Sequence, residues 1–238
     1  MVKYSIQSII KFFKSPDILK GEFKSISYKY KMFFKLFFIN LFIIALMSII
    51  TGFLRIILNI SFKEVNQQIS IIWLLNLSMI PVLEEIAYRL PLIYSKRYLA
   101  LSFMAITYFI SSILFADGIL DTSANIYIRI IIALGIGGGS YSLLTIRSIE
   151  NKISEIWTKH FKIVFYTLLC LFTIGHLGSY DISLAVLILF PILISPQFIG
   201  GVFLSFIRTK FGFGYSILFH VLINIFAFSP QIIMYLIY

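Results

Sequence analysis

The stretch SMIPVLEEIAYRLPLIY, residues 78–94, places two adjacent glutamates and an arginine inside an otherwise apolar run. An ionised side chain at the centre of a bilayer costs about 2.5–3.5 kcal/mol on insertion scales, so such residues point to a function. The rest of the chain is similarly apolar, with 60% hydrophobic and 17% aromatic residues among 238. A soluble core of this size could not bury so much apolar surface. The composition therefore predicts a polytopic membrane protein.

Seven apolar runs approach or exceed the roughly 20 residues that a helix needs to cross a bilayer. They cover about 32–54, 71–93, 98–116, 126–146, 162–178, 182–207 and 213–236. The sixth run contains Pro191, Pro196, Gly200 and Gly201, which favour a kink or a break into two helices. The glycines of GIGGGS, residues 135–140, favour close helix packing. We predict an all-α transmembrane bundle of seven or eight membrane helices.

A basic amphipathic segment at residues 1–31 is predicted to precede a transmembrane domain at 32–238. Within YSIQSIIKFFK, residues 4–14, isoleucine and phenylalanine recur at helical spacing while the lysines lie elsewhere. This pattern is typical of a helix that lies on an anionic membrane surface. We therefore expect an N-terminal interfacial helix and membrane lipids as partners.

The basic residues follow the alternation that membrane topology demands. They gather before the first run and in every second loop: Lys3, Lys11, Lys14, Lys20, Lys24, Lys29, Lys31, Lys96, Arg97, Arg147, Lys152, Lys159, Lys162, Arg208 and Lys210. Under the positive-inside rule these segments, and hence the N-terminus, are cytoplasmic. The formal charge of +10 forms no basic stripe interleaved with aromatics, so we expect no nucleic-acid partner. The Ile- and Lys-rich composition suggests a bacterial cytoplasmic membrane.

Helical spacing distinguishes the two glutamates. Glu85 and Arg89 are four residues apart, so they share a helix face and can neutralise each other. Glu84 points about 100° away and has no local partner. His176 and His220, two histidines inside other apolar runs, are the candidates to meet it. This asymmetry nominates Glu84 as the reactive carboxylate.

The seventh run adds a polar face of its own. His220 and Asn224 are four residues apart, so an imidazole and an amide lie together and could stabilise an oxyanion. A desolvated Glu84 beside a histidine could activate water. These roles together imply amide hydrolysis. The residues alone leave three classes open: a hydrolytic or metal site, a proton or ion pathway, and structural polar packing.

Three motifs in this order resemble those of the CPBP intramembrane proteases, the CAAX protease and bacteriocin-processing or Abi family, which includes the type II CAAX prenyl endopeptidases. The family's EExxxR, FxxxH and HxxxN appear as EEIAYR at 84–89, FTIGH at 172–176 and HVLIN at 220–224. The chain departs from many relatives at Tyr88, where Phe is common, and at Leu90, where Gly is common. The resemblance implies a helical membrane endopeptidase whose polar cavity opens toward the cytoplasm.

The resemblance also implies roles for the motif residues. Glu84 would activate water with help from His176, and His220 with Asn224 would hold the oxyanion. The supporting residues would be Glu85 and Arg89.

The family has been described both as metalloproteases and as glutamate proteases. A divalent metal such as zinc would be held by Glu84, His176 and His220, since catalytic zinc takes about three N or O protein ligands. The chain has no HExxH pairing. We favour a metal-free mechanism and keep the metal as an alternative.

The expected substrate is a membrane-associated peptide or protein, which in eukaryotic relatives is a prenylated, and so lipidated, tail. Two alternatives come from other classes. One is a catalytically silent membrane scaffold or bacteriocin self-immunity protein. The other is an ion-coupled transporter, against which the run LSFMAITYFISSILF, residues 101–115, offers no charged residue.

Overall fold

The computed structural model describes residues 2–18, 25–61, 71–115 and 125–237, and within these ranges every regular element is a helix. In chain order these are α1 (Val2–Lys14), α2 (Ile26–Ile57), α3 (Ile71–Tyr88), η1 (Leu90–Leu92), α4 (Lys96–Phe115), α5 (Ile126–Thr145), α6 (Arg147–Lys159), α7 (Phe161–Gly175), η2 (His176–Ser179), α8 (Leu184–Leu193), α9 (Ser195–Lys210), α10 (Phe213–Ala227) and α11 (Ser229–Ile237). The predicted all-α class is confirmed.

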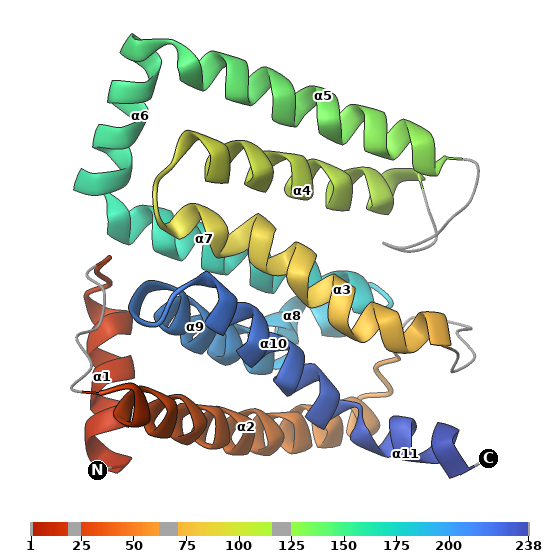
Figure 1. Ribbon diagram of the computed structural model, residues 1–238. Coiled ribbons are helices and arrows are strands. Elements are labelled where there is room, and N and C mark those ends of the chain that lie inside the picture. Colours follow the sequence, from red (N-terminus) through yellow and green to blue (C-terminus); the bar gives the residue numbers. More distant parts are fainter. Residues whose placement is uncertain (1, 19–24, 62–70, 116–124, 238) are drawn as a thin grey trace.

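Within the described ranges, five helical segments are long and apolar enough to cross a membrane. They are Ile26–Ile57, Lys96–Phe115, Ile126–Thr145, Phe161–Ser179 and Leu184–Lys210, and α10 is a shorter apolar helix. Most of these helices run side by side, while α1 and α6 lie across them at one end (Figure 1). The structure thus has the form of an integral membrane protein.

Several helix ends follow from local chemistry. α2 begins at Ile26 because the Ser25 hydroxyl accepts a hydrogen bond from the Tyr28 amide. The predicted boundary between the segments 1–31 and 32–238 therefore falls inside this helix. The sixth apolar run breaks at Ile194 as its prolines predicted, and Pro196 occupies the first turn of α9. Gly212 then adopts a φ of 112°, which turns the chain from α9 into α10.

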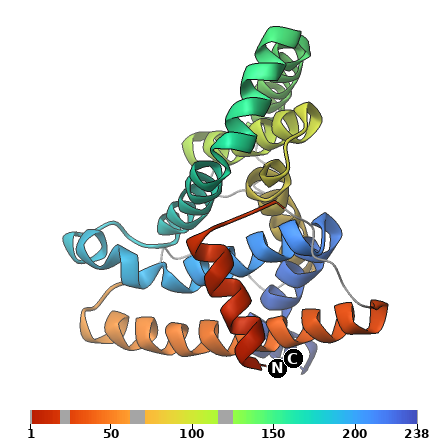
Figure 2. The ribbon, with the colours of Figure 1, turned by 90° about the vertical axis from the view of Figure 1, so that its left-hand side faces the viewer.

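Helix α9 is the centre of the protein. It is buried without interruption over 200–209, and Figure 2 shows it between α2 and α7. Leu204 and Ile207 pack in one core cluster with Phe165 of α7 and Phe219 of α10. Two of the helices that carry predicted site residues, α7 and α10, are therefore joined through α9.

The N-terminal helix shares this core. Ile9 and Phe12 of α1 are buried, and Phe12 makes edge contacts with Phe165 and Phe206 at ring-centroid distances of 5.3 and 5.4 Å. The Tyr166 hydroxyl donates to the Phe13 carbonyl at 2.5 Å. α1 is thus attached to α7 and α9.

Residues 147–159, which the sequence predicts as a loop, form the helix α6. Ile149, Ile153 and Trp157 recur at intervals of four, and Lys159 pairs with Glu155 at 2.5 Å, which together favour a helix. The indole of Trp157 donates to the Pro91 carbonyl at 2.6 Å. This contact fixes α6 against η1, the short helix that follows α3.

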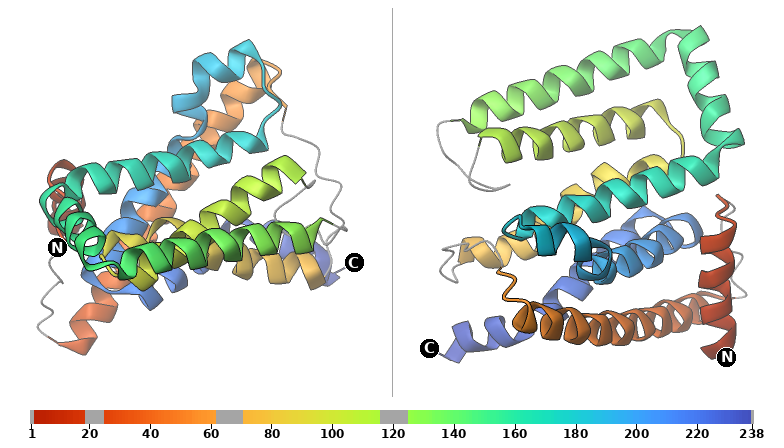
Figure 3. Two further views of the ribbon diagram at one scale, coloured as in Figure 1. Left: turned by 90° about the horizontal axis from the view of Figure 1, so that it is seen from above. Right: turned by 180° about the vertical axis from the view of Figure 1, so that it is seen from behind.

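Helices α4 and α5 form an antiparallel pair on one side of the molecule (Figure 3). Gly137 permits their close approach, because a Cβ there would lie 2.9 Å from Met104 Cβ. The close packing predicted from the glycines is therefore confirmed at this position. Arg129 of α5 is fully buried and donates to the Ser112 hydroxyl of α4 at 3.0 Å.

Candidate active site

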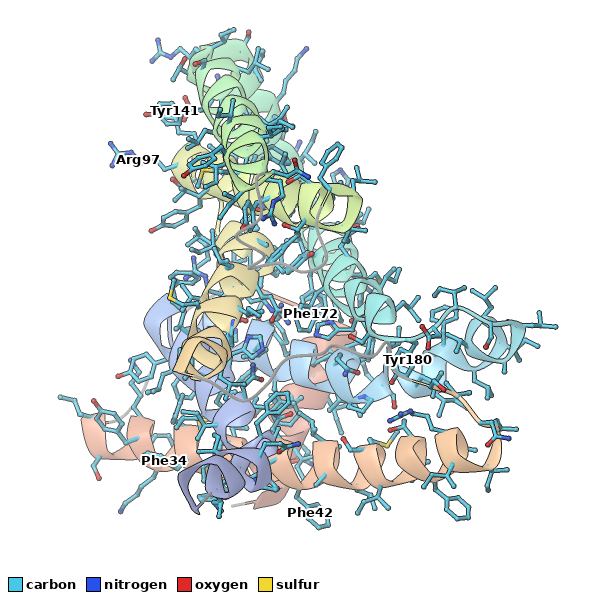
Figure 4. The ribbon with its side chains drawn as sticks, turned by 90° about the vertical axis from the view of Figure 1, so that its right-hand side faces the viewer. Phe34, Phe42, Arg97, Tyr141, Phe172 and Tyr180 are labelled. Atoms are coloured by element: carbon cyan, nitrogen blue, oxygen red, sulfur yellow. The ribbon has the colours of Figure 1, made fainter. Side chains whose placement is uncertain are left out.

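Three helices bring Glu84, His176 and His220 together. Glu84 lies near the end of α3, His176 at the junction of α7 with η2, and His220 within α10. One carboxylate oxygen of Glu84 lies 3.9 Å from His176 Nε2, and the other lies 3.5 Å from His220 Nε2. Phe172, one turn before His176, marks this region in Figure 4. Residues that are 92 and 136 positions from Glu84 in the chain thus face the same side chain.

The contacts of Glu84 are looser than direct hydrogen bonds. A charge-assisted bond of this kind measures about 2.7–2.9 Å, whereas these distances are 3.5 and 3.9 Å. The side chains of Glu84 and His176 are 15% and 27% exposed, so water can reach them. Separations of this length between Glu84 and the two rings can be bridged by a water molecule. Glu84 is therefore not locked to either ring.

Glu85 is wholly buried and has three partners. Its Oε1 lies 3.7 Å from Arg89 Nε, which confirms the predicted ion pair, and 3.0 Å from His220 Nδ1. Its Oε2 accepts a hydrogen bond from the Ser216 hydroxyl. The bonds from His220 and Ser216 were not predicted, because they join different helices.

The partners of the two rings fix their orientation. His220 Nδ1 faces the Glu85 carboxylate, and His176 Nδ1 faces the Phe172 carbonyl at 2.9 Å. Both partners are acceptors, which assigns a proton to each Nδ1. Each Nε2 therefore faces Glu84, as an acceptor when its ring is neutral and as a donor when its ring is an imidazolium.

Arg89 lies against the ring of Phe172, with Cζ 3.7 Å from the ring centroid. Its two Nη atoms are buried and have no hydrogen-bond partner among the described residues. Gly201 of α9 makes room for this group, because a Cβ there would lie 3.1 Å from Arg89 Nη2 and 2.6 Å from Leu169 Cδ1. The sequence prediction treated Gly201 only as a possible kink.

The end of α3 is held by a second arginine that the sequence prediction did not include in the site. Arg208 of α9 donates from Nε to the Arg89 carbonyl at 3.0 Å and from Nη2 to the Leu90 carbonyl at 3.2 Å. These carbonyls follow the last turn of α3, where a cation is favourable. Arg208 thereby positions the segment that carries Glu84 and Glu85.

Asn224 lies one turn beyond His220 on α10 and is half-buried. Within the described part of the chain its side chain makes no hydrogen bond. Its part in an oxyanion site therefore stays a prediction.

The placement of the donor side chains bears on metal binding. Within the described ranges, no group of three His, Cys, Asp or Glu side chains is placed so that it could hold a metal. The trio Glu84, His176 and His220 does not fit a metal as it is arranged here.

Comparison with known proteins identifies no relative. No family model, no curated protein and no solved structure matches this chain.

Proposed function

We propose that the protein is an intramembrane endopeptidase of the CPBP type, which hydrolyses peptide bonds of membrane-associated proteins or peptides. The observation that supports this most is the meeting of Glu84 with both imidazoles inside an apolar helical protein. Buried ionisable groups are costly in such a protein, and a partly exposed carboxylate without a tight partner is suited to proton transfer.

The proposed reaction uses Glu84 as the general base. Its carboxylate takes a proton from a water that His176 helps to orient, and the water oxygen bonds to the carbonyl carbon of the peptide. The carbonyl oxygen becomes negative and accepts hydrogen bonds from His220 Nε2 and the Asn224 amide. When the C–N bond breaks, the leaving nitrogen takes the proton from Glu84. The products are a carboxyl group and an amine.

The oxyanion role sets a condition on His220. Its Nδ1 proton is committed to Glu85, so Nε2 donates only in the imidazolium form. In this form the charges of the site balance, since Glu84 and Glu85 together offset Arg89 and a protonated His220. Arg89 and Glu85 thus support the site without contacting the substrate.

The proposed membrane arrangement has α3 and α10 entering the bilayer beside the five long spans, which makes seven when α8 and α9 count as one. The basic chain segments collect at the end of the bundle where α1 and α6 lie (Figure 1). By the positive-inside rule this end, with the N-terminus, faces the cytoplasm of a bacterial cell. α1 and α6 would then lie at the lipid headgroups.

The test is the substitution Glu84→Gln, which keeps the size of the side chain and removes the base. Membranes from cells that lack the protein are incubated with purified protein in liposomes, and new peptide N-termini are mapped by mass spectrometry. We expect the wild type to create termini that the variant does not. Glu150→Gln, a substitution of a carboxylate on α6 outside the site, is the control and should behave as the wild type.

The same termini from Glu84→Gln would refute the proposal. A cellular phenotype that survives the substitution would instead favour the scaffold or immunity function.

A further inference from the structure

We infer that Ser216 is a positioning residue of this site, which acts through Glu85 on the ring of His220. The inference rests on the proposed function for its catalytic consequence, and on geometry for the positioning itself. Ser216 belongs to none of the three motifs.

Ser216 and His220 are one helical turn apart on α10, and both bond to the carboxylate of Glu85. The Ser216 hydroxyl donates to Glu85 Oε2, and His220 Nδ1 lies 3.0 Å from Glu85 Oε1. Ser216 and Glu85 are fully buried, and His220 is 6% exposed. One face of α10 thus holds both oxygens of a carboxylate that belongs to α3.

The hydroxyl has one hydrogen and two possible acceptors. Besides Glu85, the Leu204 carbonyl of α9 lies 3.2 Å from Ser216 Oγ. The charged carboxylate is the stronger acceptor, so the hydrogen goes to Glu85. Ser216 therefore lies where α3, α9 and α10 meet, and its hydroxyl donates a hydrogen bond to Glu85.

Arg89 explains why the Ser216 hydrogen bond to Glu85 affects the orientation of His220. Its Nε is 3.7 Å from Glu85 Oε1, and its two Nη atoms have no partner among the described residues. Without Ser216, Glu85 Oε2 loses its donor and the carboxylate can rotate toward these nitrogens. His220 Nδ1 then loses an aligned acceptor, and its Nε2 leaves its place 3.5 Å from Glu84. Ser216 keeps Glu85 facing the histidine.

The experiment compares Ser216→Ala and Ser216→Thr with Ser205→Ala. Ser205 is a matched control, because it is also buried and its hydroxyl donates only within its own helix, to the Gly201 carbonyl at 2.8 Å. ¹⁵N spectra of the histidine side chains are recorded in lipid nanodiscs, with His220→Gln to assign the His220 signals. kcat and KM are measured on a peptide that spans a cleavage site found with the wild type.

We expect Ser216→Ala to shift the Nδ1 and Nε2 signals of His220 and to lower kcat about tenfold, the effect of losing one charge-assisted hydrogen bond, while KM stays within twofold. Ser216→Thr, which restores the hydroxyl, should restore both signals and kcat. Ser205→Ala should change neither.

Unchanged His220 signals in Ser216→Ala, or equal shifts in Ser205→Ala, would overturn the inference. Thermal unfolding of each variant in detergent shows whether it is folded, and if Ser216→Thr is not, Ser216→Cys, a weaker donor, should give shifts between those of wild type and Ser216→Ala. The two proposals fail separately. Loss of proteolysis in Glu84→Gln with no spectral effect of Ser216 would refute only the positioning role, whereas the spectral effect without Glu84-dependent proteolysis would refute only the enzyme.

Discussion

Replacing Gly201 with alanine should disturb the site from within the protein core. The added Cβ would lie 2.6 Å from Leu169 Cδ1, 3.1 Å from Arg89 Nη2 and 3.2 Å from Phe172 Cδ1. The first contact is closer than real Cβ atoms tolerate, and Leu169 and Phe172 are themselves buried. Overpacking of this kind costs about 1–3 kcal/mol. The displaced groups include Arg89, the partner of Glu85, so proteolysis should fall as well.

The magnitude can be isolated with a second glycine. Alanine is favoured over glycine inside a helix by about 1 kcal/mol, which offsets part of the steric cost at Gly201. At Gly138 of α5 an added Cβ meets nothing within 4 Å, so Gly138→Ala carries the helix preference without the clash. The difference between the two variants is therefore the steric cost, about 1–3 kcal/mol in the free energy of unfolding.

Unfolding in mixed detergent micelles, followed by circular dichroism, measures both variants under one condition. Gly138→Ala should match or exceed the wild type, and Gly201→Ala should be the less stable of the two. Equal stability would show that α9 does not approach α7 and Arg89 as closely as described. It would also contradict the role of Gly201 in making room for Arg89.

Three further outcomes are expected. Arg208→Met keeps the aliphatic stem but leaves the Arg89 and Leu90 carbonyls without their donor, so the free energy of unfolding should fall by about 2–3 kcal/mol. Arg97 is exposed, and Arg97→Met should change the free energy of unfolding by less than about 0.5 kcal/mol. Similar losses in both variants would contradict the role given to Arg208. Proteolysis should survive a zinc chelator, because Glu84 needs no metal to accept a proton in the proposed reaction; loss on chelation and recovery on adding zinc would restore the metal alternative. In a Cys170→Ser background, a cysteine placed in α6 should react with an impermeant thiol reagent only from the cytoplasmic side, and labelling from outside would reverse the proposed orientation.

The sequence was most informative where contacts are local. The Glu85–Arg89 pair follows from a spacing of four on one helix, and the break before α9 follows from its prolines. The meeting of Glu84 with His176 and His220 was suggested by elimination, since few polar partners exist inside the apolar runs.

The other contacts between helices were missed for a physical reason: they depend on how helices rotate against one another. Nothing local shows that Arg208 reaches the end of α3, or that His220 bonds to Glu85 as well as facing Glu84. Ser216 left a usable signal, because it is a polar residue four positions before His220 in an apolar helix. α6 left one too, in the spacing of Ile149, Ile153 and Trp157.

The attachment of α1 to α7 has a consequence for biosynthesis. Phe13 and Tyr166 are bonded across 153 residues, and a ribosome that adds about 5–20 residues per second makes the second partner roughly 8–30 s after the first. During that interval neither α7 nor α9 is available to the nascent helix, so the isoleucines and phenylalanines that pack against them must be buried elsewhere. An amphipathic helix can bind at the lipid headgroups. The apolar face of α1 would therefore contact lipid during insertion and become part of the protein core once α7 and α9 are in place.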